Sequence, residues 1–219
     1  MNRTLVPALA MTALLGAPQV GADGLAVTAK AGTLGLGLEL SGGPSDYFNA
    51  RAGINYFDYD YSDEYENIEY DMELELRSVA GLLDIHPAGG GFRLTGGMLF
   101  NENELAAKAK PDDTFEIGGT EYPAALVGDL TGQIDFDDFA PYVGLGWASD
   151  NGGDGGFGMS VDLGVAYQGS PDVALAASGP ISSDPMFQED LEAERQALAD
   201  DLEDYKYYPV VAVGFNYRF

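Results

Sequence analysis

Hydrophobic and polar residues alternate with a period of two along most of the chain. The clearest stretch is the C-terminal one, whose odd positions hold Tyr205, Tyr207, Val211, Val213, Phe215, Tyr217 and Phe219. Such alternation predicts a strand with two chemically different faces. Because the apolar face ends in aromatic rings, it suits a strand that faces lipid and meets the membrane interface.

The same alternation recurs at 34–40, 48–56, 72–82, 92–101, 139–147 and 157–168. Each segment approaches or exceeds the roughly 9 to 11 residues with which a tilted strand crosses a bilayer. In a soluble sandwich, the alternative fold, the apolar faces would form the core. In a membrane barrel they meet lipid, so that Leu74, Leu76 and Leu82 point outward and the polar faces line a lumen. The predicted lumen residues are Glu39, Arg51, Glu75, Arg77, Arg93, Asp162 and Arg218.

These segments predict an all-β fold, an antiparallel up-and-down transmembrane β-barrel. Single-chain bacterial barrels have an even number of strands, so we expect eight, one more than the alternation places. Either a further strand precedes residues 25–40, or Val173–Ala177 supplies it. The 30 glycines, about twice the usual share, fit small inward positions in a narrow barrel.

Short and long connections alternate along the chain. The short ones are 41–46, 86–91 and 148–156, and the long ones are about 57–68, 109–132 and 169–204. Since outer-membrane barrels have short periplasmic turns and long extracellular loops, we expect the long connections outside the cell and the C-terminus in the periplasm.

The last long connection contains one predicted acidic helix, over 184–204. Asp184 is placed to cap it and Pro185 to begin it, and Phe187, Leu191, Leu198, Leu202 and Tyr205 form one apolar stripe. We expect this helix to pack over the barrel mouth. A plug in the lumen and a docking face for a partner are the alternatives.

The N-terminus has the features of a secretory signal peptide. Arg3 precedes an apolar run from Leu5 to Leu15, and small residues end at Ala22. We therefore expect residues 1–22 to be removed and 23–219 to form the barrel domain in the outer membrane of a Gram-negative bacterium. The formal net charge of −26 disfavours nucleic acid, because each phosphate contact needs a Lys or Arg. No disulfide is possible without cysteine.

Acidic residues concentrate in the long connections. Residues 58–75 hold nine acids and no basic residue. A solvated repulsive surface explains this composition, and a rim that gathers divalent cations is the sharper alternative. The weak metal candidates are Asp58, Asp60, Glu69, Asp135, Asp137 and Asp138. Asp58 and Asp60 follow a calcium-loop register, but Asp63 stands where that loop needs glycine, so no metal site is predicted.

No catalytic arrangement or cofactor motif emerges from the sequence. Outer-membrane hydrolases commonly use a histidine beside Ser or Asp near the outer rim, whereas His86, the single histidine, lies in a short turn expected on the periplasmic side. The glycine-rich segments lack the Lys-Ser/Thr of a phosphate loop and belong to strands. We therefore predict a protein that is not an enzyme and has no cofactor.

With these features the chain resembles small outer-membrane barrels of the OmpA, OmpX and OmpW kind. The resemblance implies that Val213, Phe215, Tyr217 and Phe219 form the signal read by the barrel-assembly machinery. We predict a monomer in outer-membrane lipid that acts as a narrow channel for small solutes or cations. The alternatives are a structural or surface-interaction barrel that binds a partner through acidic outer loops, and a lipid- or peptide-hydrolysing enzyme.

Overall fold

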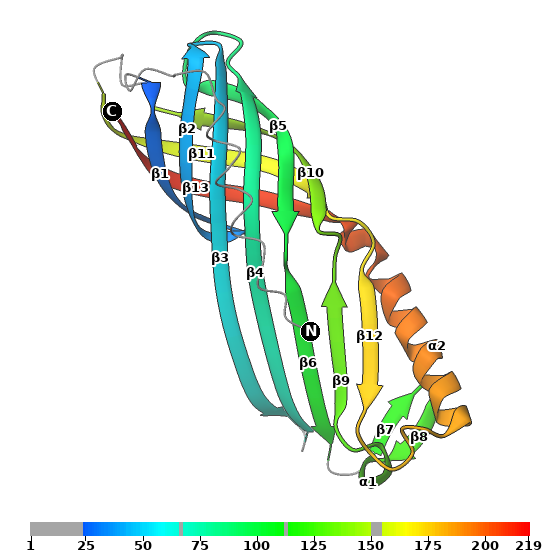
Figure 1. Cartoon of the computed structure of the whole chain (residues 1–219). Coiled ribbons are helices and arrows are strands. Elements are labelled where there is room, and N and C mark those ends of the chain that lie inside the picture. The colour runs from blue at the N-terminus through cyan, green and yellow to red at the C-terminus, as the bar shows by residue number, and fades with distance from the viewer. Residues whose placement is uncertain (1–23, 66–67, 112–113, 150–154) are drawn as a thin grey trace.

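The computed structural model describes residues 24–65, 68–111, 114–149 and 155–219, so the expected signal peptide lies outside the described residues. Its main body is a closed antiparallel barrel of eight strands (Figure 1). The ring consists of β1 (Ala26–Gly32), β2 (Gly35–Ser45), β3 (Phe48–Tyr65), β4 (Ile68–Ile85), β5 (Phe92–Asn101), β10 (Phe139–Ala148), β11 (Gly156–Tyr167) and β13 (Tyr207–Arg218). It closes where β1 pairs with β13. The predicted all-β barrel is confirmed.

The strand that the alternation does not place is β1. It forms a tight hairpin with β2 in which Gly32 pairs with Gly35 around Thr33 and Leu34. Gly35 has φ of 92°, which an L side chain rarely adopts, so glycine makes this turn possible. Residues 25–40 therefore supply two strands, and the expectation that the missing strand precedes them is wrong. Val173–Ala177, the other candidate, lies outside the ring.

The outward face of the ring is apolar, and its inward face carries buried charged and polar groups, small residues and, toward the sheet extension, a layer of apolar side chains. Leu36, Val143 and Phe157 are exposed on the outside, whereas Glu39 and Arg51 are buried inside. This distribution reverses that of a soluble protein and is favourable where hydrocarbon surrounds the ring.

Aromatic side chains gather at both ends of this outward face. At the end with the short turns, which we call the turn end, Phe157 and Tyr217 pack edge to face with ring centroids 4.9 Å apart. At the opposite end, Phe100 contacts Phe139 at 4.9 Å. Aromatic belts of this kind mark the two interfaces of a membrane.

A second sheet continues from the ring beyond the second aromatic belt. Pairing of β2 with β3 ends at Tyr56, and pairing of β4 with β5 ends at Ser78, but the β3–β4 hairpin continues. Three further strands join it in the order β4–β6–β9–β12. We call these five strands the sheet extension, and its added members are β6 (Glu104–Pro111), β9 (Leu130–Asp135) and β12 (Asp172–Ala177).

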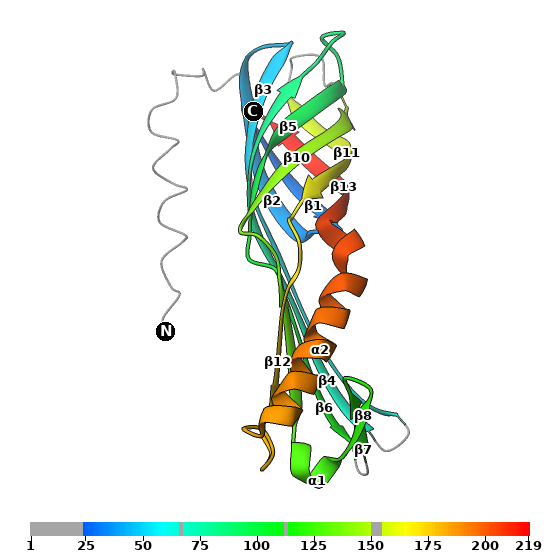
Figure 2. The same cartoon turned by 90° about the vertical axis from the view of Figure 1, so that its right-hand side faces the viewer.

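The predicted helix is present as α2 (Pro185–Asp201). The Asp184 carboxylate accepts hydrogen bonds from the backbone N–H groups of Met186 and Phe187, as expected of an N-cap. The helix runs alongside the sheet extension, where it packs against β12, and does not cover the barrel mouth (Figure 2). The expectation of a helix over the mouth is therefore wrong, and α2 does not plug the lumen.

A small hydrophobic core fixes α2 to the extension. Phe187 and Leu191 are buried with Ile117 and Val127. The surrounding elements include β7 (Thr114–Ile117), β8 (Thr120–Pro123) and α1 (Ala124–Val127). The 3-10 helix η3 (Glu203–Lys206) follows the other end of α2 and leads into β13. No helix in the described part of the chain is long and apolar enough to cross a membrane.

The long connections contain regular secondary structure. The described part of 57–68 continues β3 and β4, and 109–132 and 169–204 supply β7, β8, β12 and both α-helices. Water-exposed strands at one end of a membrane barrel need neighbours of their own, and these segments provide them.

The two faces of the sheet exchange polarity where the extension begins. Along β3, Ile54 points outward from the ring, but Asp58 and Asp60 occupy the same face beyond Tyr56. Along β4 the outward face changes from Leu83 to Glu73. The ring contacts lipid on this face, while the extension turns its polar face to water.

This exchange corrects the predicted orientation of β4. Leu82 points into the ring and is 6% exposed, whereas Leu83 points outward and is 67% exposed. Leu74 and Leu76 share the inward face with Leu82, since strand residues two apart lie on one side. The prediction that Leu74, Leu76 and Leu82 face lipid is wrong. In the water-exposed extension the apolar residues of β4 stand at even positions, but in the membrane the lipid-facing residues of the same strand stand at odd positions.

Candidate functional site

A buried cluster of charges crosses the middle of the barrel, centred on Arg51 of β3. Its Nε lies 2.8 Å from Asp84 Oδ2 on β4, and its Nη1 lies 3.2 Å from Glu39 Oε1 on β2. Nη2 donates to Thr95 Oγ1 on β5 at 3.1 Å. One guanidinium group therefore connects four consecutive strands of the ring.

Two further cations complete the cluster from the other side. Arg93 Nη2 lies 2.8 Å from Asp162 Oδ1, and that oxygen is also 3.4 Å from Arg51 Nη1. Lys30 Nζ lies 3.0 Å from Glu39 Oε2. Three cations thus face three carboxylates, and this balance allows the charges to be buried.

Glycines provide the room that these side chains occupy. A Cβ on Gly146 would lie 2.6 Å from Asp162 Oδ1 and 2.9 Å from Arg93 Nε. A Cβ on Gly164 would lie within 2.6 Å of three atoms of the Tyr142 side chain. At these two positions, the narrow ring accommodates large inward groups because a glycine beside them has no side chain.

Apolar side chains fill the lumen between this cluster and the sheet extension. Leu82, Leu99, Tyr142 and Val210 are buried together there with Leu34 from the β1–β2 turn. The space left among them and the charge cluster has a volume of about 20 Å³, little more than one water needs. In the described residues the lumen is closed at this end.

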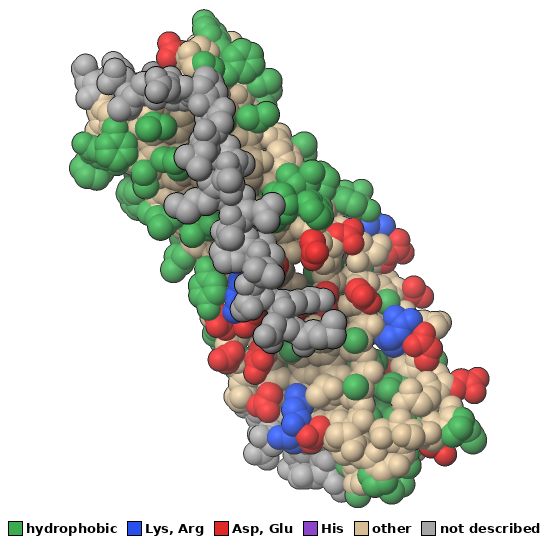
Figure 3. All heavy atoms as spheres, viewed as in Figure 1, with side chains coloured by type: hydrophobic (Ala, Val, Ile, Leu, Met, Phe, Trp, Pro, Cys, Tyr) green, Lys and Arg blue, Asp and Glu red, His purple; other side chains and the backbone are tan. Residues whose placement is uncertain are grey.

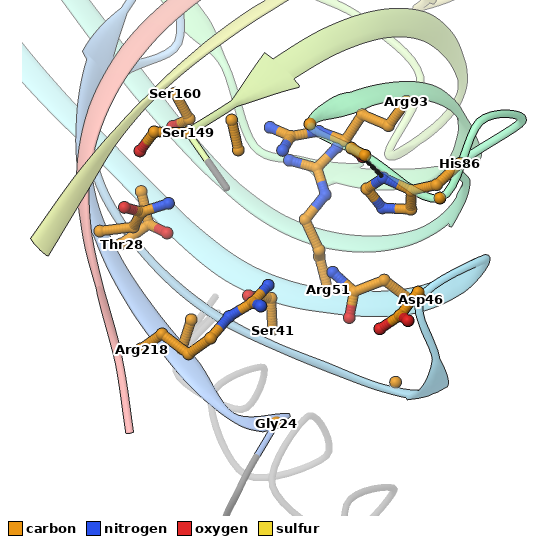
Figure 4. A pocket seen from close by; sticks show the side chains of 18 of the residues that line it. Gly24, Thr28, Ser41, Asp46, Arg51, His86, Arg93, Ser149, Ser160 and Arg218 are labelled. Atoms are coloured by element: carbon orange, nitrogen blue, oxygen red, sulfur yellow. Dashed lines mark hydrogen bonds between the residues drawn. The ribbon is translucent and has the colours of Figure 1, made fainter. Parts of the chain in front are cut away.

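A polar cavity opens at the turn end of the barrel. Its volume is about 460 Å³, and Arg51 and Arg93 lie together at its closed end (Figure 4). Arg218 and His86 line the wider part. The cavity is therefore a blind vestibule that ends at the charge cluster.

The structure places four of the predicted lumen residues in this cluster: Glu39, Arg51, Arg93 and Asp162. Arg218 lies at the mouth of the vestibule. Thr95 and Tyr142, on the polar faces of 92–101 and 139–147, also lie in the lumen. Lys30 and Asp84 belong to the lumen as well, but the sequence did not predict them. Lys30 could have been predicted from its alternation with Val27 and Ala29. Asp84 could have been predicted only if the even-numbered residues of β4 had been assigned to the inside of the ring.

Glu75 and Arg77 require a correction, because they do not lie in the lumen. They occupy the outward face of β4 and form an ion pair of 3.0 Å, with side chains 41% and 46% exposed. The reason is that the odd-numbered residues of β4, which include Leu83, point outward from the ring, and the even-numbered ones point inward. The Arg77 guanidinium also lies over the Tyr56 ring, 5.6 Å from its centroid.

The polar face of the sheet extension carries a continuous row of carboxylates. Successive cross-strand partners, from β3 to β12, are Asp58, Glu75, Glu104, Asp135 and Asp172. We call these five residues the acidic row. Like charges directly opposite each other in a sheet repel, so the row costs stability and produces a strong local negative potential. Charged side chains are dense on this part of the molecule (Figure 3).

The weak metal candidates are distributed over this region without forming a site. Asp58, Asp60 and Asp135 lie on the extension, Asp137 and Asp138 follow β9, and the side chain of Glu69 lies outside the described residues. Among the described side chains, no three acidic or histidine groups are placed to hold one metal ion.

His86 has a structural contact in its turn. Its Nδ1 lies 2.8 Å from the Gly90 carbonyl oxygen, which can only accept, so Nδ1 carries the proton of this hydrogen bond. Its backbone N–H donates to the Tyr47 carbonyl at 2.9 Å. These bonds hold the turn between β4 and β5.

Three residues of the expected assembly signal lie on the outward face of β13, and the fourth, Phe219, directly follows the strand. Val213, Phe215, Tyr217 and Phe219 are all exposed to the membrane side. Recognition by the assembly machinery stays a prediction.

Comparison with known proteins supports the membrane assignment. Neither a protein-family model nor a curated protein matches the chain. The crystal structure of CarO2 from Acinetobacter baumannii matches with a TM-score of 0.62 and 24% identity, and that of CarO from the same organism with 0.61 and 25%. Each match covers 90% of this chain and 98% of the other. Together with the closed eight-stranded ring, these matches to outer-membrane proteins fit a small outer-membrane β-barrel.

Proposed function

We propose that the protein is a closed membrane anchor that displays an acidic platform for a cationic partner. The platform is the sheet extension with α2, and we place it on the outer surface of a Gram-negative cell. The filled lumen carries this proposal. A ring blocked by three ion-paired cations and an apolar layer has no path for a solute, while a large part of the chain builds the platform.

Three structural features support a binding role for the platform. It has its own hydrophobic core around Phe187, so it holds a defined shape. Its acidic row concentrates negative charge on one face. Its polar face also contains a groove of about 600 Å³ lined by Asp60, Glu73 and Lys108. A cationic partner would be attracted to this face and guided toward it.

The anchor proposal makes a clear prediction for electrical recordings. The purified full chain in a planar bilayer should give no step conductance, because the charge cluster closes the lumen. Reproducible cation-selective steps from folded protein would overturn the closed anchor and support the narrow channel that the sequence suggests. Folding is checked on the same sample by comparing boiled and unboiled protein on a detergent gel.

Binding and sidedness need separate measurements. Nanodisc-held protein should bind immobilised polylysine, and Glu75→Gln combined with Asp135→Asn should weaken this binding several-fold.

Because the chain contains no cysteine, Ser183→Cys and Asp46→Cys each give one thiol. An impermeant maleimide should label Ser183→Cys, but not Asp46→Cys, on intact cells. The reverse labelling would place the platform in the periplasm.

A further inference from the structure

The two edges of the sheet extension are treated differently. At the β12 edge, α2 packs against the strand, and Arg195 Nη1 donates to the Val173 carbonyl at 3.5 Å. At the opposite edge, β3 from Phe57 onward pairs with β4 on one side. No other strand of the described chain pairs with it there, since β2 reaches only to Tyr56. This part of β3 lies at the margin of the extension (Figure 1).

An open strand edge is a template for another strand, because alternate backbone N–H and C=O groups point away from the sheet. Proteins commonly cover such edges with a helix, as β12 is covered here. The β3 edge is therefore an interaction surface by its backbone geometry, and its side chains determine what can pair with it.

The side chains of this edge alternate between acidic and aromatic. Asp58 and Asp60 lie on the polar face, and Phe57 and Tyr59 lie on the other, where they are 38% and 53% exposed. The Phe57 and Tyr59 rings stack with centroids 6.3 Å apart and planes within 13°. An added strand would need basic residues opposite the aspartates and apolar residues against the two rings.

The acidic row reinforces this charge preference. It begins at Asp58 on the open edge, and its neighbour Glu75 pairs across the strands with Asp58. In the next row, Asp60 faces Glu73. A cation opposite Asp58 or Asp60 would thus meet the field of several carboxylates, whereas an acidic residue would be repelled by all of them.

The same charges disfavour a second copy of this chain as the occupant. Two antiparallel β3 edges centred on Tyr59 would bring Asp58 of each copy opposite Asp60 of the other. Like charges directly opposite destabilise strand pairing. The edge is thus protected against self-association and remains open to a strand of opposite charge.

We propose that the β3 edge from Phe57 to Asp60 binds an extended segment of alternating basic and apolar residues by adding it to the sheet. This inference rests on the proposed platform function and names the chemistry of its partner. Backbone pairing would supply the geometry, the aspartates would select basic side chains, and Phe57 and Tyr59 would cover the apolar ones.

The test uses the full chain in nanodiscs of zwitterionic lipid and fluorescent eight-residue peptides, followed by anisotropy. A peptide of alternating Lys and Val should bind, and one of alternating Glu and Val should not. Two further Lys–Val peptides carry methyl groups on alternate backbone nitrogens, one on the Lys nitrogens and the other on the Val nitrogens. One of the two should bind at least tenfold more weakly, because only one set of N–H groups faces the edge. Equal affinity of all three Lys–Val peptides would overturn strand addition.

The two ends of the acidic row provide matched variants. Asp58→Lys, at the open edge, should weaken Lys–Val binding about tenfold and favour the Glu–Val peptide. Asp172→Lys, at the covered edge, makes the same charge change and should alter binding less than twofold. Equal losses in the two variants would overturn the edge site. If the Lys–Val peptide fails to bind, edge docking is wrong, and polylysine binding then decides separately whether the platform function survives.

Discussion

Arg51 and Asp84 form the most deeply buried ion pair of the described chain, with Nε 2.8 Å from Oδ2 and side chains 3% and 0% exposed. The pair joins β3 to β4 at the level where the vestibule ends. Because Arg51 also contacts Glu39 and Asp162, it compensates three carboxylates that have little access to water.

Replacing this arginine should strongly destabilise the barrel. Arg51→Met leaves buried carboxylates without their main cation, and breaking a buried pair in this way costs roughly 3 to 5 kcal/mol. The free energy of unfolding in urea, followed by Trp147 fluorescence in lipid vesicles, measures the loss. Arg77→Met is the matched control, since it breaks the exposed pair with Glu75 and should cost less than about 1 kcal/mol. Similar losses in both variants would contradict the structural role of the cluster.

The platform core should be separable from the barrel. Phe187 is buried against the Tyr122 ring, with centroids 5.1 Å apart, and Phe187→Ala should cost the local core about 3 to 5 kcal/mol. We expect proteolysis within 180–205 to accelerate while the ring keeps its heat-modifiable migration on gels. Met186→Ala, at the neighbouring exposed position, serves as the control and should leave proteolysis unchanged. Loss of the folded ring in Phe187→Ala would show that the two parts fold together.

The alternation of the sequence predicted the barrel because lipid and lumen impose opposite demands on successive residues. Seven of the eight ring strands carry large apolar groups on alternate positions. β1 was not predicted because outward residues such as Ala29 and Ala31 are small and because only Thr33 and Leu34 separate it from β2. A strand of this kind becomes recognisable only when its partners β2 and β13 are known.

The sheet extension could not be predicted from the sequence, for a different reason. In 72–82 the apolar face of β4 is the inward one throughout. The outward face of the same strand meets water in the extension and lipid in the ring. Alternation reports two faces without stating which one meets which solvent. Glu75 and Arg77 were therefore placed in the lumen, and the acidic row was invisible because its members come from five separate strands. The N-cap of α2 was predictable, since Asp184 acts on residues two and three positions later.

The acidic row should limit the stability of the extension. Asp135 faces Glu104 on one side and Asp172 on the other, so Asp135→Asn removes two like-charge contacts. We expect a gain of about 0.4 to 2 kcal/mol at low salt, and a smaller gain in 0.5 M salt because screening already weakens the repulsion. Hydrogen exchange of the β9 amides measures the local effect. A decrease in protection at low salt would show that the Gln133 hydrogen bond to Asp135, at 3.0 Å, outweighs the repulsion.

The contact between Tyr122 and Asp190 predicts an alkaline transition in the docking of α2. The Tyr122 hydroxyl donates to Asp190 Oδ2 at 2.6 Å, and this hydrogen bond to a carboxylate raises the pKa of Tyr122 from 10.0 to about 12. A raised pKa favours the protonated phenol in the folded state. The contribution to stability is therefore complete below pH 10 and is lost as the pH rises through about 12.

The pKa of Tyr122 can be followed from the ¹³Cζ resonance of labelled tyrosine, which Tyr122→Phe assigns by its disappearance. In the wild-type chain the midpoint should lie near pH 12. Asp190→Ala removes both the acceptor and its negative charge, so the midpoint should move most of the way back toward 10. Asp201→Ala, an exposed change at the end of the same helix, should leave it in place. If the titration midpoint of Tyr122 does not change in Asp190→Ala, then burial, and not the carboxylate, raises the pKa of Tyr122.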